Sequence, residues 1–100
     1  MKQELNSAVG YQDGAIVSKE IMKSDAGTIT LFAFSAGQGL SEHTAPFNAF
    51  VHILDGEAMI SISGEEQTVI AGEIIILPAN KPHALRADKA FKMLLVMIRG

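Results

Sequence analysis

The chain has 100 residues, enough for one domain with a single hydrophobic core. Hydrophobic residues make up 48% and charged residues 19%, a balance typical of globular chains and not of disordered ones. The net charge of -3, with lysines and arginines scattered singly, excludes the basic surface that nucleic-acid binding needs. The absence of cysteine excludes disulfides, thiolate metal sites and a cysteine nucleophile.

The ends of the chain carry no membrane signal. Residues 1–10 contain one lysine and no apolar core, unlike a secretory signal, and the apolar run 93–98 is too short to span a bilayer. We therefore expect a cytoplasmic protein without membrane association.

Residues 1–14 are polar and mixed, and their apolar residues follow no clear helical or strand period. We interpret them as an N-terminal arm that precedes a domain at residues 15–100. Residues 15–23 fit either a strand or a helical turn. The turn signal Asp25-Ala26-Gly27 favours a hairpin with the next run. In residues 28–35 both alternating faces are largely apolar, which predicts a strand covered on both sides.

The stretch 37–56 begins with a polar, turn-rich segment that contains His43. An apolar strand at 50–54 follows, and Asp55-Gly56 predicts a tight hairpin turn. Further strands are expected at 58–63, 67–70, 74–77, 83–87 and 91–98, separated by turn signals. Eight to ten short strands without a helical window predict an all-β domain.

Two stretches of the chain match a pair of known motifs. Gly37, His43 and Gly56 fit the first motif of the cupin family, G-x5-H-x-H-x3-4-E-x6-G. In the second stretch, the residues that fit G-x5-P-x-G-x2-H-x3-N are Gly72, Pro78 and His83. The chain thus resembles a small single-domain cupin, which implies an RmlC-like jelly-roll β-barrel.

The chain departs from both motifs. Ala45 replaces the second histidine and Ala49 the glutamate of the first motif, so two of the four usual metal ligands remain. Asn80 replaces a glycine of the second motif and tolerates a left-handed backbone, while Ala87 replaces the closing asparagine.

The resemblance implies that His43 and His83 point into the same barrel mouth. The lost side chains leave room there, and an apolar pocket with a few polar groups is typical of small-molecule sites. Alternatively, bulk from Phe47 or Met59 fills the gap. The candidate ligand-binding residues are His43, His83, Ala45, Phe47, Ala49, Val51, Leu85 and Ala87.

A metal site is the competing interpretation of the two histidines. His43 and His83 are the candidate ligands of a divalent transition metal, and imidazole suits several such ions. Catalytic zinc normally has three protein ligands, and non-haem iron needs a carboxylate. Strand parity predicts that Glu42 and Asn48 point away from His43.

Three function hypotheses follow. The leading one is a module that binds a small molecule through His43 and His83. The alternative is a metal-dependent cupin enzyme, of dioxygenase or isomerase type, with an incomplete ligand set. A filled barrel would instead indicate a structural or interaction domain. Whether the chain is an enzyme is left open, because no carboxylate is clearly placed beside either histidine.

A homodimer is the predicted assembly. Apolar residues occupy both faces of residues 28–34, 50–54 and 91–98, whereas one barrel interior buries only one face of each strand. The outward residues include Phe50, His52 and Leu54, with His52 interpreted as structural. Cover by the N-terminal arm is the alternative to a subunit interface.

Overall fold

In this computed structural model, which describes residues 2–99, one short helix precedes eight strands. The elements are α1 (Leu5–Ala8), β1 (Ile16–Ser24), β2 (Gly27–Phe34), β3 (Gly39–His43), β4 (Asn48–Ile62), β5 (Glu65–Ile70), β6 (Ile74–Leu77), β7 (His83–Arg86) and β8 (Phe91–Ile98). The predicted all-β class is confirmed. Within the described residues, no helix is long and apolar enough to cross a membrane.

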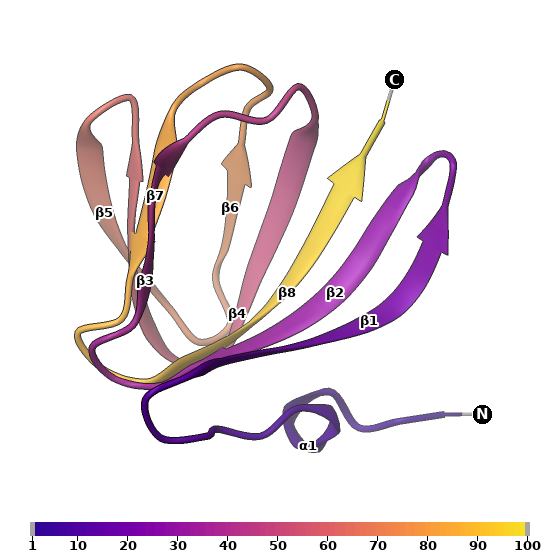
Figure 1. Ribbon diagram of the computed structural model, residues 1–100, viewed down its shortest axis with the longest axis vertical. Helices are drawn as coiled ribbons and strands as arrows, with labels where there is room; N and C mark the ends of the chain where they lie inside the picture. Colours follow the sequence, from indigo (N-terminus) through magenta and orange to yellow (C-terminus); the bar gives the residue numbers. More distant parts are fainter. Residues whose placement is uncertain (1, 100) are drawn as a thin grey trace.

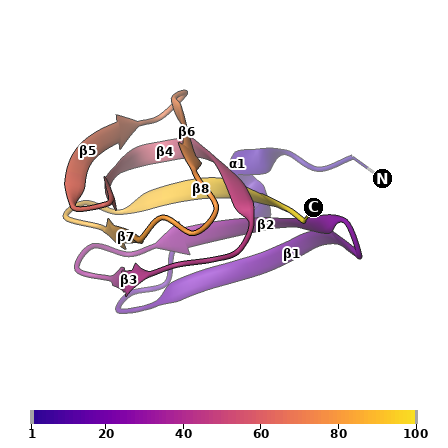
Figure 2. The ribbon, with the colours of Figure 1, turned by 90° about the horizontal axis from the view of Figure 1, so that it is seen from above.

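The strands form a curled, wholly antiparallel jelly-roll barrel (Figure 1). The first sheet has the order β1-β2-β8-β4-β6, and the second contains β3, β7, β4 and β5. The long strand β4 belongs to both sheets and joins them. Seen from above, the two sheets enclose one interior, open at the end where β3 and β8 finish (Figure 2).

The predicted hairpin turn at Asp55-Gly56 is wrong, because β4 continues through both residues. The register of β4 against β8 shifts between Ile53 and Asp55, which marks a β-bulge. Gly56 adopts a φ of 74°, which an L side chain rarely adopts. The bulge bends β4 from one sheet into the other instead of reversing the chain.

The inward residues of both sheets form the hydrophobic core of the barrel, following the period of two along each strand. At the closed end, the rings of Phe34 and Phe91 stack with centroids 4.5 Å apart, and both side chains are fully buried. This aromatic pair seals the end opposite the open mouth.

A second, smaller apolar cluster lies outside the barrel, on the first sheet. Its buried residues are Val9 of the N-terminal arm together with Leu31 and Ala33 of β2. Tyr11 donates a hydrogen bond to Asp55, which fixes the arm against the bulge of β4. The expectation that residues 28–35 are covered on both sides is therefore confirmed for the middle of β2.

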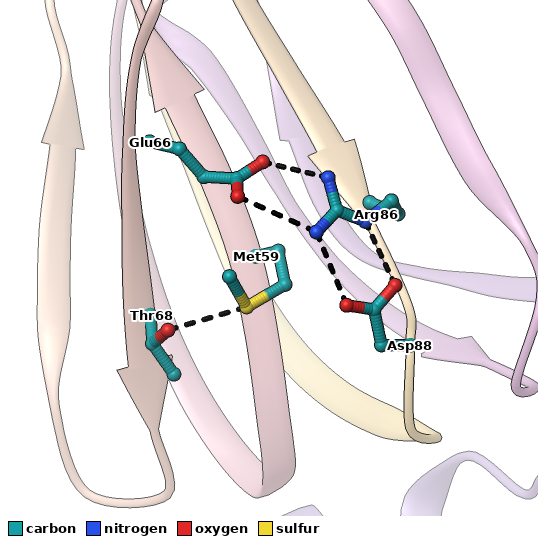
Figure 3. Close-up of polar contacts among 5 residues, drawn as sticks. All are labelled: Met59, Glu66, Thr68, Arg86 and Asp88. Carbon is teal, nitrogen blue, oxygen red and sulfur yellow. Dashed lines mark hydrogen bonds and ion pairs between the residues drawn. The ribbon is translucent and has the colours of Figure 1, made fainter.

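The outer face of the second sheet is polar by contrast (Figure 3). Arg86 donates hydrogen bonds to Glu66 and to Asp88, and the hydroxyl of Thr68 donates one to the sulfur of Met59. The side chains of Arg86 and Glu66 are 52% and 42% exposed, so solvent screens this ion pair. The pairs order side chains on a wet surface and contribute little to stability.

Candidate functional site

His43 and His83 lie side by side at the open end of the barrel. His43 ends β3 and His83 begins β7, and the two residues are cross-strand partners. The imidazole rings meet edge to face, with centroids 4.4 Å apart and an interplanar angle of 70°. A register irregularity between Leu40 and His43 precedes the pair.

Backbone carbonyls hold one nitrogen of each ring. The Nδ1 of His43 lies 2.7 Å from the carbonyl oxygen of Ser41, and the Nδ1 of His83 lies 3.2 Å from that of Lys81. A carbonyl oxygen only accepts hydrogen bonds, so each Nδ1 carries the proton. In the neutral rings each Nε2 therefore presents a lone pair, which accepts a hydrogen bond or binds a metal.

The two histidines differ in their environment. His83 is 6% exposed, whereas His43 is exposed at the rim. Burial lowers the pKa of His83 below its ordinary value, and the neighbouring His43 lowers the same pKa further. The hydrogen bond to the Lys81 carbonyl opposes this shift only in part. At neutral pH, His83 is therefore a neutral hydrogen-bond acceptor.

A cavity of about 90 Å³ lies beneath the pair, between the two sheets. Apart from the two imidazoles, every lining side chain is apolar. The lining residues are Phe32, Leu40, His43, Ala45, Ala49, Leu77, His83, Leu85, Met93, Leu95 and Met97. The arrangement can hold a small apolar group against the first sheet while its polar end meets the imidazoles.

Five of the eight residues predicted from the sequence line this cavity: His43, His83, Ala45, Ala49 and Leu85. The other three do not. Val51 and Ala87 are buried in the core of the barrel. The guanidinium of Arg99 lies over the ring of Phe47, with its carbon Cζ 5.4 Å from the ring centroid.

The methionines at the cavity wall were missed by the sequence analysis. Met93, Leu95 and Met97 alternate along β8 and face the histidines from the opposite sheet. The period of two at residues 93, 95 and 97 could have identified them as inward residues. Met59, which the sequence offered as a filler of the gap, instead contacts Thr68 on the outer face.

No third ligand group completes the histidine pair within residues 2–99, where no cluster of three or more His, Cys, Asp or Glu side chains forms. Glu42 is exposed, and the side-chain oxygen of Asn48 accepts a hydrogen bond from the Ala79 amide. Ala45 and Ala49 offer no donor atoms at the cavity.

The backbone of Asn80 connects the two motif stretches, 37–56 and 72–87. Asn80 adopts a left-handed φ of 63° at the position where the second motif has glycine. Its amide donates a hydrogen bond to the carbonyl of Ala45, 2.8 Å away, and so joins the two motif loops. This link holds the segments that carry His43 and His83 together.

The Cupin domain family matches residues 30–98, which include both histidines and most of the barrel. The chain is a cupin. Its structure is similar to that of a conserved protein of unknown function from Streptococcus pyogenes, with 35% identity and a TM-score of 0.95. That match covers 100% of this cupin and 88% of the streptococcal chain.

A cupin 2 conserved barrel domain protein from Leptotrichia buccalis is 41% identical, with a TM-score of 0.92. The match covers 95% of this chain but only 46% of the Leptotrichia chain, so the cupin spans about half the length of that protein. A cupin superfamily protein from Desulfitobacterium hafniense is 28% identical, with a TM-score of 0.92, and the match covers 96% of this chain and 88% of that one. Comparison with curated proteins gives no match.

The usual metal set of three histidines and a glutamate does not fit this cupin. Ala45 and Ala49 occupy two of the four motif positions, and the cavity side chains next to them are aliphatic. Among the described residues that line the cavity, two imidazoles are the polar side chains, and none is a carboxylate.

Proposed function

We propose that this cupin binds a small organic molecule in the barrel mouth, with His43 and His83 as its polar contacts. The observation that carries the proposal is the pairing of two acceptor nitrogens with an otherwise apolar cavity. Small-molecule sites commonly combine apolar walls with a few placed polar groups.

The chemistry of the pair defines the class of ligand. Each Nδ1 donates to a backbone carbonyl, so in the neutral form of either imidazole the Nε2 accepts a hydrogen bond and does not donate one. The complementary ligand group is a hydroxyl or an amine. The cavity of about 90 Å³ is far below the roughly 300 Å³ of a drug-sized site, so only a small part of a larger ligand would enter it.

Calorimetric titration of metal-free protein against a panel of small hydroxyl- and amine-bearing metabolites tests the proposal. We expect binding that is lost in the His43→Ala, His83→Ala double variant. The control is His52→Ala, which removes the third histidine from the opposite, outer face of β4. Affinity unchanged in the double variant would refute a role for the pair.

The second candidate is a metal-dependent enzyme in which the two free Nε2 atoms are the only side-chain ligands. It is favoured by the proximity of the two imidazole rings and weakened by the missing third ligand. Elemental analysis of protein purified without a chelator or a metal-binding tag separates the two candidates. A stoichiometric transition metal that disappears in His43→Ala would favour the enzyme.

A further inference from the structure

The last strand, β8, ends at the open end of the barrel, and Arg99 is the next residue (Figure 1). The amide of Arg99 donates a hydrogen bond to the carbonyl of Ala26, 2.8 Å away, which extends the antiparallel pairing of Gly27 with Ile98 by one residue. The backbone therefore continues the strand, and the side chain of Arg99 leaves on the same face as that of Met97. Because Met97 lines the cavity together with both imidazoles, Arg99 lies on the inward face of the first sheet, one step nearer the solvent.

Phe47 lies opposite Arg99, just before β4. The register pairs Asn48 with Ile98, so Phe47 and Arg99 form the next pair toward the mouth. Their side chains meet, since the guanidinium carbon Cζ lies 5.4 Å from the centroid of the ring. A ring face attracts a cation but accepts no conventional hydrogen bond, so this contact leaves the N–H donors of the guanidinium for another partner. Phe47 thus positions Arg99 at the mouth without saturating it.

The guanidinium of Arg99 is a positive charge that no carboxylate of residues 2–99 neutralises. The ion pairs in this part of the chain involve Arg86 and Lys89 instead. Arg99 is exposed, and an arginine stays charged throughout the physiological pH range. With two imidazoles on the second sheet and no carboxylate in the described cavity lining, the mouth favours an anion over a neutral or cationic ligand.

We propose that Arg99 binds the carboxylate of the ligand, so that the molecule in the mouth is a short hydroxy acid. The assignment rests on the proposed function, because it names the chemical class of the ligand for the same mouth. A hydroxy acid is an anion at neutral pH, whereas an amino acid is a neutral zwitterion. The planar guanidinium donates two parallel hydrogen bonds to a carboxylate, a geometry that a lysine ammonium does not offer. The hydroxyl then donates to an Nε2 of the histidine pair, and the apolar chain enters the cavity.

The cavity limits the length of that apolar chain. Its volume of about 90 Å³ is roughly three times the ~30 Å³ that one water molecule occupies in the liquid, which suits an alkyl chain of about three carbons. The probe that combines the three groups is 2-hydroxy-3-methylbutanoate, which has a carboxylate, a hydroxyl and an isopropyl group. Its primary amide has nearly the same shape and no charge.

Titrations of the metal-free protein with this acid and with its amide, followed by proton–nitrogen NMR, test the assignment. We expect the acid to bind at least tenfold more tightly, because a hydrogen bond between charged groups contributes roughly tenfold or more in affinity. In Arg99→Gln the affinity for the acid should fall to that for the amide, while the affinity for the amide stays unchanged. Arg99→Lys keeps the charge without the planar fork and should retain only part of the preference.

The matched control is Arg86→Gln, which removes a guanidinium from the outer face of the second sheet, where the side chain is 52% exposed. It should keep the full preference for the acid. Urea denaturation verifies that the variants fold. Equal binding of acid and amide to the unmodified protein, a preference that survives in Arg99→Gln or is lost in Arg86→Gln as well, or no binding of either compound at tens of millimolar would overturn the assignment.

The double variant His43→Ala, His83→Ala separates the role of Arg99 from the proposed function. If acid and amide bind the unmodified protein equally and both are lost in the double variant, the role of Arg99 is refuted and the proposed function stands. If the double variant binds the acid with unchanged affinity and preference, Arg99 is supported as the anion site, and the histidines are refuted as polar contacts.

Discussion

The imidazole rings of His43 and His83 lie edge to face, with centroids 4.4 Å apart, at the open end of the barrel. One ring is exposed at the rim and the other is buried against apolar side chains. Protonating both rings at once would place two positive charges side by side, so the pair resists full protonation.

The stability of the fold should therefore decrease in mild acid. His83 has a lowered pKa in the folded state and an ordinary value of about 6.5 when unfolded, so the unfolded chain binds the proton more readily. The free energy of unfolding is lost progressively as the pH falls from about 6.5 toward the lowered pKa. Urea titrations at pH 7.5 and 5.5 should show this loss, and His83→Gln should show less of it. An unchanged pH dependence in the variant would contradict the assignment.

Removing one ring should change the titration of the other. Besides burial, His43 lowers the pKa of His83, so in His43→Ala the pKa of His83 should rise toward its ordinary value. The imidazole resonances in a proton–carbon NMR titration report this directly. A pKa of His83 that stays where it is in the unmodified protein would mean that burial alone sets it.

Restoring the two missing motif residues should create a metal site. The double variant Ala45→His, Ala49→Glu places a third imidazole and a carboxylate at the positions where the cupin motif has them. We expect its affinity for Co²⁺ to exceed that of the unmodified protein by more than roughly tenfold, because zinc-type sites need at least three protein ligands. Visible absorption of the bound ion measures it. The single variants should show a smaller gain.

A side chain at Gly56 should disrupt the bulge that joins the two sheets. A Cβ there would lie 2.1 Å from the carbonyl oxygen of Ala90, and the φ of 74° is unfavourable for an L residue. Gly56→Ala should lower the free energy of unfolding by about 2–4 kcal/mol, from backbone strain and the clash together. Gly72 has a φ of +90°, but a Cβ added there would have no atom within 4 Å, so Gly72→Ala should cost only about 1–2 kcal/mol. Equal losses in urea denaturation would show that the clash is relieved.

The hydrogen bond from Tyr11 to Asp55 should hold the N-terminal arm on the sheet. Tyr11→Phe removes the donor but keeps the ring under Lys92, and should cost about 0.5–1.5 kcal/mol. Hydrogen exchange of the amides around Val9 should accelerate before that of the barrel. Asp55→Asn retains an acceptor and should have a smaller effect. Unchanged exchange in Tyr11→Phe would show that apolar packing alone holds the arm.

Local pattern in the sequence determined the strands and the two histidines of the site. The alternation of apolar and polar residues predicted the strands, and the apolar residues at both alternating sets of positions predicted the two apolar faces of β2. These predictions were possible because successive side chains point to opposite faces of a strand, which is a property of each strand alone. The resemblance to the two cupin motifs implied that His43 and His83 meet. Turn chemistry failed at Asp55-Gly56, since the same dipeptide serves a hairpin or a bulge and only the partner strand β8 distinguishes them.

Only the tertiary structure decided what surrounds the pair. Met93 and Met97 reach the cavity from the opposite sheet, and Phe47 turns away to lie under Arg99. The arm covers Leu54 but leaves Ile76 exposed. These relationships depend on how far β4 bends and how the two sheets close over each other. Such closure is set by register and packing between residues distant in the chain, which no local pattern contains.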